Sequence, residues 1–177
     1  MVAASRDKSF PRFWFFTVDP DVDGVDEGDQ EAIADFIEKV LLHPMGWRKH
    51  GYRFIRTSPE EGFFARQRMS NIKHVLHLRL SLPGTVEKHC KFDGLSCASL
   101  ENNVVYFNRN RWFHGSKASG LTLDAYRVYL VCHEVGHLLD RGHKRCSNDS
   151  RDLCPVMYQQ TISKGCCTPN PWPLDWE

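Results

Sequence analysis

The sequence predicts one domain of the α/β (α+β) class: a small mixed β-sheet, two long helices and a cysteine-rich C-terminal coil. Three observations support this fold class. The 177 residues suffice for one domain with a sizeable core and are short for two, so we treat 1–177 as a single domain. Hydrophobic residues make up 41% and charged residues 25%, as in ordinary globular proteins. Apolar residues alternate in some segments and follow helical spacing in others.

The first strand and the first helix are predicted from the N-terminal part of the chain. Residues 10–18 are rich in aromatic side chains and lead into an acidic turn, which is typical of a strand followed by a loop. Within 26–42, apolar residues recur three and four positions apart, the spacing of a helix with one buried face. The dipeptide His43-Pro44 ends this helix.

Three further strands and a second helix follow. Residues 52–57, 74–82 and 103–108 have strand patterns, and in the second of them leucines alternate strictly. A helix is expected over 122–140, with Thr122 as its N-cap. The predicted order is therefore β-α-β-β-β-α, followed by a coil rich in Cys, Pro and Trp.

The charge balance and the hydropathy pattern exclude two classes of partner. Lys and Arg number 23 against 22 Asp and Glu, for a net charge of +1. Nucleic-acid-binding proteins usually show a clear basic excess, so we exclude nucleic acid. No apolar run approaches the roughly 20 residues of a membrane helix, and the aromatic run 13–16 is neither a signal region nor an anchor. We expect a soluble monomer without membrane insertion and without a visible export signal.

The seven cysteines indicate disulfide bonds. No C-x-x-C pair occurs, which makes a four-cysteine zinc site less favourable than disulfides formed in an oxidising compartment. The expected pairs are Cys90 with Cys97, which closes a short loop, and Cys146 with either Cys166 or Cys167. An odd number leaves at least one thiol unpaired. The cysteine content therefore predicts a secreted or extracytoplasmic protein.

The second predicted helix contains the run His133-Glu134-Val135-Gly136-His137. Histidines four positions apart lie on one face of a helix, where both imidazoles reach a single ion. Glu134 directly follows His133, so its carboxylate can reach a metal-bound water without being a ligand itself. A zinc ion lowers the pKa of that water towards 7, and the carboxylate takes its proton. The spacing predicts a zinc site with Glu134 as general base and then general acid.

A third histidine, His143, follows six residues after His137. On a straight helix it would lie roughly 9 Å further along the axis, so the helix must end and the chain must turn back. Gly142 supplies backbone freedom for this turn, and Asp140 tolerates a left-handed conformation. We expect His143 to be the third ligand. Asp140 remains open as an alternative third ligand or as a hydrogen-bond partner of a ligand histidine.

The sequence HEVGHLLDRGH resembles the metzincin signature H-E-x-x-H-x-x-G-x-x-H, which is followed by a tight turn containing methionine. Asp140 stands at the position of the signature glycine, and Met157 is the candidate for the turn. The resemblance implies a metzincin-like zinc metallopeptidase, with 26–42 as a backing helix and 122–140 as the active-site helix. One catalytic Zn²⁺ would be held by His133, His137 and His143, with water in the fourth position. Met157 would give the site an apolar floor without ligating the ion.

A narrower resemblance covers roughly positions 45 to 173. This part of the chain is similar to a bacterial family of uncharacterised, mostly extracytoplasmic zinc peptidases. Five segments carry it: 108–115 (NRNRWFHG), 123–127 (LDAYR), 131–137 (VCHEVGH), 155–161 (PVMYQQT) and 166–173 (CCTPNPWP). The chain departs from that family at Cys132, Asp140 and Cys154. This resemblance implies the metal-peptidase class and supplies no substrate.

Other candidate residues have less specific roles. Tyr158 either stabilises an oxyanion or packs against its neighbours. Cys132 is expected to be buried or paired, because adjacent residues on a helix point about 100° apart. His74, His77 and His114 are not expected to be ligands.

The sequence therefore favours a zinc-dependent endopeptidase that hydrolyses peptide bonds with a metal-activated water. Its protein or peptide substrate would lie along a free edge strand. A non-catalytic binding module stabilised by zinc is one alternative, although such a module has no use for Glu134 and usually has a fourth protein ligand. A zinc amidase acting on a non-peptide amide is the other, and it would share the same chemistry.

Overall fold

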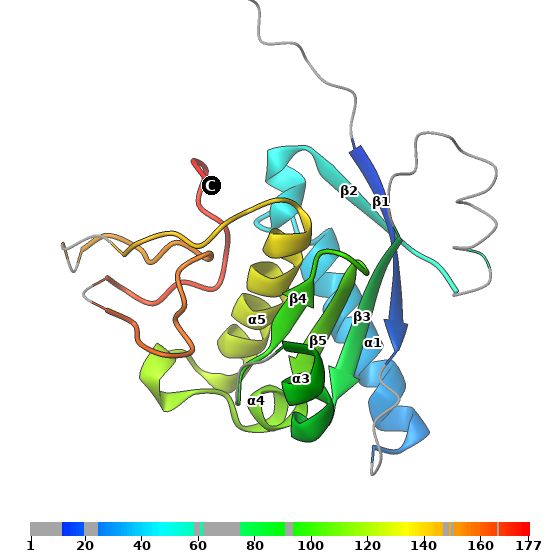
Figure 1. Cartoon of the computed structure of the whole chain (residues 1–177). Helices are drawn as coiled ribbons and strands as arrows, with labels where there is room; N and C mark the ends of the chain where they lie inside the picture. The colour runs from blue at the N-terminus through cyan, green and yellow to red at the C-terminus, as the bar shows by residue number, and fades with distance from the viewer. Residues whose placement is uncertain are drawn as a thin grey trace, which may run out of the picture.

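A five-stranded β-sheet lies at the centre of the fold (Figure 1). In this computed structural model the described residues are 12–19, 25–58, 61, 75–90, 94–146, 149, 151–165 and 167–177. The strands are β1 (Arg12–Asp19), β2 (Tyr52–Arg56), β3 (Val75–Ser81), β4 (Cys97–Ser99) and β5 (Val104–Asn108). Their order in the sheet is β2-β1-β3-β5-β4. The pair β4–β5 is antiparallel and the other three pairs are parallel, so the sheet is mixed as predicted.

Helices cover both faces of the sheet. They are α1 (Glu27–Leu42), α3 (Pro83–Cys90), α4 (Arg109–His114) and α5 (Leu123–Leu138), with two 3-10 turns, η1 (Trp47–His50) and η2 (Lys117–Ser119). Strand β5 shows how the faces divide, because Val105 and Phe107 belong to the main core that α1 and α5 share. Val104 and Tyr106 instead join a smaller cluster with α3. Alternate residues of a strand point to opposite faces, so β5 is covered on both sides.

The predicted helices and strands are confirmed, with shifts at their ends. The Asp26 and Thr122 side chains cap α1 and α5 by accepting hydrogen bonds from backbone N–H groups of the first turns. Strands β2, β3 and β5 lie within the segments predicted for them. Positions 10 and 11 of the first predicted strand lie outside the described residues. Helix α5 ends at Leu138, two residues before its predicted end.

Three short elements, α3, β4 and α4, were not predicted from the sequence. They contain 8, 3 and 6 residues, too few to show a periodic apolar pattern. Strand β4 is the important omission, since it adds an edge to the sheet next to α5. The disulfide between Cys90 and Cys97, which was expected from the spacing, joins the end of α3 to the start of β4.

The chain after α5 forms the expected cysteine-rich coil. Its described residues contain no helix or extended strand, and one isolated bridge joins Leu153 to Thr168. In Figure 1 this segment runs from yellow to red and passes beside α5. The fold class is therefore the predicted one. Among the described residues, no helix has the length and apolar character needed to cross a membrane.

Candidate metal centre

Helix α5 carries the run 133–137 and ends immediately after it. The Asp140 and Arg141 N–H groups donate to the His137 and Gly136 carbonyls at 3.0 and 2.9 Å, which closes the last turn. This pattern requires a left-handed residue at position 140, and Asp140 has φ 62°. The turn therefore depends on Asp140. The expectation that Gly142 supplies the backbone freedom is wrong, since Gly142 does not have a positive φ.

This turn brings His143 back to the two helical histidines. The Nε2 atoms of His137 and His143 lie 3.1 Å apart. Ring centroids are separated by 4.9 Å for His133 and His137, and by 5.3 and 4.7 Å for His143 and each of them. One ligand atom from each of the three lies within 4.8 Å of the others. Two nitrogens bound to a tetrahedral zinc ion at roughly 2.05 Å are about 3.3 Å apart, so the arrangement fits one ion.

Both helical histidines use Nδ1 to contact a backbone carbonyl. His133 Nδ1 lies 2.7 Å from the Val156 oxygen, and His137 Nδ1 lies 2.9 Å from the Arg141 oxygen. A carbonyl only accepts hydrogen bonds, so Nδ1 must carry the proton in each ring. The lone pair of Nε2 is then left for a metal ion, as in most histidine ligands.

Burial sets the charge states at the centre. Burial, together with the neighbouring His137 and His143, lowers the pKa of His133 to about 3. Burial also lowers the pKa of His137 and of His143. These shifts favour the neutral imidazole, which is the form that binds metal. Burial raises the pKa of the Glu134 carboxyl to about 8, and a nearby divalent cation would oppose that shift by favouring the carboxylate.

Met157 lies beneath the histidine run, against Gly136. A Cβ atom on Gly136 would lie 2.5 Å from the Met157 Sδ and 2.7 Å from Cζ2 of Trp47, so this position requires glycine. Met157 and Trp47 are buried, and the Trp47 indole donates to the Cys132 carbonyl at 2.8 Å. The sequence pattern predicts Met157 near the site, whereas the packing roles of Gly136 and Trp47 could not be predicted, because a close packing contact leaves no local pattern.

The centre opens into a cleft of about 220 Å³. The three histidines and Glu134 line it, together with Tyr129. One wall comes from the region of β4 and consists of Leu95, Ser96, Cys97, Ala98 and Leu100. The other wall comes from the coil and consists of Gln159, Thr161 and Ile162. The cleft thus lies between the edge strand of the sheet and the segment that follows Met157.

Several residues considered from the sequence lie elsewhere. Asp140 is exposed and lies outside the three-histidine group, and the hydrogen bonds of those histidines go to other groups, so neither of the alternative roles left open for Asp140 is seen. The Tyr158 hydroxyl lies beside Gly165 rather than in the cleft. His114 is exposed, as expected, and His77 pairs with a threonine hydroxyl. Cys132 is buried, one of the two outcomes expected for it, and it forms no disulfide, whereas His74 lies outside the described residues.

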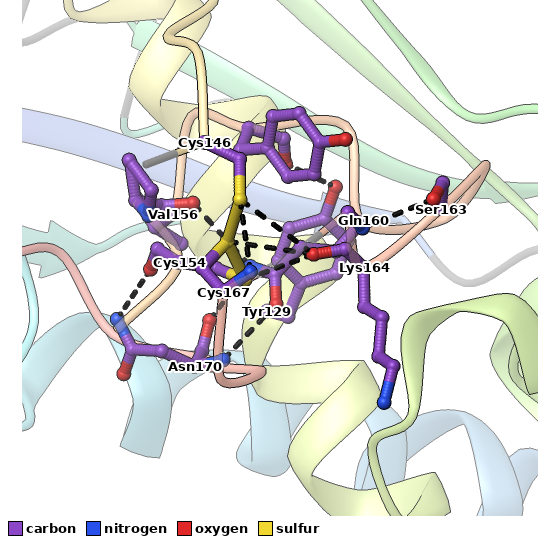
Figure 2. The surroundings of a disulfide bond; sticks show 12 residues. Tyr129, Cys146, Cys154, Val156, Gln160, Ser163, Lys164, Cys167 and Asn170 are labelled. Carbon is purple, nitrogen blue, oxygen red and sulfur yellow. Dashed lines mark hydrogen bonds between the residues drawn. A yellow bond between two sulfur atoms is a disulfide. The ribbon is translucent and has the colours of Figure 1, made fainter. Parts of the chain in front are cut away.

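Three cysteines meet in the coil (Figure 2). The Cys167 sulfur lies within bonding distance of both Cys146 and Cys154, although one sulfur forms only one disulfide at a time. Pairing of Cys146 with Cys167 was expected, whereas the approach of Cys154 was not. Cys166, the alternative partner, lies outside the described residues. Disulfides of this kind are typical of oxidising compartments.

The fold and the site together define an α/β protein with a three-histidine centre beside a buried glutamate. The chain belongs to the family described as "Protein of unknown function (DUF3152)", whose model matches residues 4–167. No curated protein and no solved structure matches it.

Proposed function

We propose that the protein is a zinc-dependent endopeptidase that hydrolyses peptide bonds with water. One observation carries the proposal: three neutral imidazoles converge beside the buried carboxyl of Glu134, and all four side chains line a cleft. The metzincin-like pattern of the sequence supports the same conclusion. A purely structural zinc site would close with a fourth protein ligand, and the described residues near the histidines supply none.

Each residue has a role in this proposal. His133, His137 and His143 would hold the zinc ion, which supplies a Lewis acid for the scissile carbonyl and lowers the pKa of water. Glu134 takes the proton of the attacking water and returns it to the leaving nitrogen. A buried carboxylate beside a cation suits this task, because burial raises its proton affinity while the cation keeps it ionised.

The edge strand favours a peptide over other amides. Among the described residues β4 pairs with β5 alone, and residues of β4 line the cleft. The unpaired side of such a strand accepts an extended peptide as an additional strand. A compact amide has no extended backbone with which to use this edge. Leu95, Leu100 and Ile162 add apolar surface for a side chain next to the scissile bond.

The test combines metal analysis with a cleavage assay. Purified protein should contain about one zinc per chain and should cleave members of a proteome-derived peptide library. Glu134→Gln should keep the zinc and lose nearly all hydrolysis, because the substitution preserves shape but removes the proton acceptor. The control is Glu87→Gln, which removes an exposed carboxylate of α3 outside the cleft.

The possible results separate the three functions. Wild-type turnover in Glu134→Gln would contradict the mechanism. Zinc without cleavage of any peptide would support the binding module or the amidase, and cleavage of an acylated sugar or of a cell-wall crosslink would select the amidase. A protein that binds no zinc would contradict the metal centre itself.

A further inference from the structure

The Glu177 carboxylate is buried against the turn that contains Met157. Its Oε1 accepts a hydrogen bond from Met157 N at 2.9 Å, and its Oε2 accepts from Val156 N at 2.9 Å and Leu174 N at 2.8 Å. The residue is only 4% exposed. Three N–H donors directed at two oxygens are the pattern of an ionised carboxylate, because a protonated one would bring a donor of its own.

One peptide unit connects this carboxylate to a histidine of the centre. The N–H of Met157 and the C=O of Val156 belong to the same peptide, and the Val156 oxygen accepts from His133 Nδ1 at 2.7 Å. The hydrogen bonds therefore connect the Glu177 carboxylate to the 156–157 peptide, and that peptide to the His133 imidazole. A hydrogen bond to the N–H of an amide increases the electron density on its oxygen, so successive bonds in such a chain strengthen one another.

We propose that Glu177 is a positioning residue that acts on His133 through the 156–157 peptide. A carboxylate that accepts directly from a ligand histidine fixes its tautomer and orientation and raises its basicity towards the metal. Here the peptide transmits the same influence over a longer path. The inference rests on the proposed function, since it takes His133 to be a metal ligand.

His137 provides a comparison within the same molecule. Its Nδ1 also contacts a backbone carbonyl, that of Arg141 at 2.9 Å. The N–H of that peptide belongs to Gly142, which has no hydrogen-bond acceptor among the described residues. Of the two helical histidines, only His133 therefore has a carboxylate behind its acceptor, and its Nδ1–O distance is the shorter.

The first measurement uses metal-free protein and ¹⁵N NMR of the histidine rings. The shift of a protonated ring nitrogen moves downfield as its hydrogen bond strengthens. In the wild type, Nδ1 of His133 should lie downfield of Nδ1 of His137. In Glu177→Gln, the His133 signal should move upfield while the His137 signal stays, because one amide group cannot accept from all three N–H donors.

The second measurement is zinc affinity by competition with a chelator. Glu177→Gln should weaken binding about tenfold, the lower end of what partners of ligand histidines contribute. The matched control is Asn170→Ala, which removes a buried side chain of the same coil that contacts other carbonyls. This control should lower the melting temperature but leave the His133 signal and the zinc affinity unchanged.

The outcomes are decisive for the role of Glu177. A His133 signal and a zinc affinity that change equally in both variants would show that Glu177 only stabilises the coil, which overturns the proposal. If Glu177→Gln does not fold, the wild type alone still tests the proposal. A wild-type His133 Nδ1 signal upfield of the His137 Nδ1 signal would overturn it. A wild type that binds no zinc would contradict the proposed function, while the NMR comparison would still test the connection from Glu177 to His133.

Discussion

The two halves of the three-histidine centre are held in place by different kinds of bond. His133 and His137 lie on α5, where a repeating ladder of backbone hydrogen bonds sets their spacing. His143 and Met157 lie in a segment whose described residues form no helix or strand. Polar side chains satisfy much of the backbone there. Three of them are buried: Gln160, Asn170 and Glu177.

Asn170 and Gln160 show how such a segment is stabilised (Figure 2). Asn170 Nδ2 donates to the carbonyls of Cys154 and Trp172 at 2.9 and 2.6 Å. The Gln160 amide pairs with both backbone groups of Asn170, at 2.8 and 3.0 Å. A helix distributes its backbone bonds over many equivalent residues, whereas this coil concentrates them on a few side chains. A single substitution in the coil should therefore cost more than one on the helix surface.

His143→Ala should have the largest effect, because it removes the coil's contribution to the centre. Two histidines do not hold zinc against a moderate chelator, so zinc affinity should fall more than about 100-fold, beyond the usual loss of an indirect partner. His114→Ala, an exposed histidine outside the cleft, is the control. Chelator competition measures both variants on one scale. An affinity within tenfold of wild type in His143→Ala would contradict the three-histidine assignment.

The comparison also explains which features could be predicted from the sequence. The run 133–137, the cap at Thr122 and the return of His143 to the two helical histidines follow from helical spacing and from residue types that end helices, which are local properties. Glu177 and Trp47 could not be found this way. Glu177 contacts Val156, 21 positions away, and Trp47 contacts Cys132, 85 positions away. Strand β4 was missed because three residues are too few for an alternating pattern. The part of the site that long-range contacts supply could therefore not be predicted from the sequence.

Asn170→Ala should destabilise the protein by about 3 kcal/mol, the largest stability change we expect in the coil. The variant leaves the buried Cys154 carbonyl and the partly buried Trp172 carbonyl without this donor, and an unsatisfied buried group costs about 1–3 kcal/mol. Urea unfolding measures the change. Asn102→Ala, an exposed loop asparagine, should change stability by less than about 0.5 kcal/mol. Equal losses in the two variants would show that the coil does not depend on its buried amides.

Gly136→Ala should destabilise the protein by about 2 kcal/mol, because the new methyl group overpacks the contact between the two halves. It would meet Met157 and Trp47 at 2.5 and 2.7 Å. Gly84→Ala is a matched control in α3, since its Cβ would meet nothing within 4 Å. That substitution should be neutral or stabilising by about 0.5–1 kcal/mol. Thermal unfolding of both variants measures the difference, and destabilisation by both would exclude a packing effect specific to Gly136.

Substitutions of Asp140 should have the smallest effects, because this residue only joins the two halves. Its side chain is exposed and its backbone is left-handed, so its role is conformational. Asp140→Ala should cost about 1 kcal/mol, since alanine is strained at positive φ, while Asp140→Asn should be neutral and Asp140→Gly neutral or slightly stabilising. All three variants should keep zinc affinity within about twofold of wild type, well short of the roughly 10–100-fold loss expected for a hydrogen-bond partner of a ligand histidine.

Urea unfolding and chelator competition measure the two effects separately. A large loss of zinc in Asp140→Asn with unchanged stability would return this carboxylate to the metal centre and would mean that the turn after α5 does more than reverse the chain.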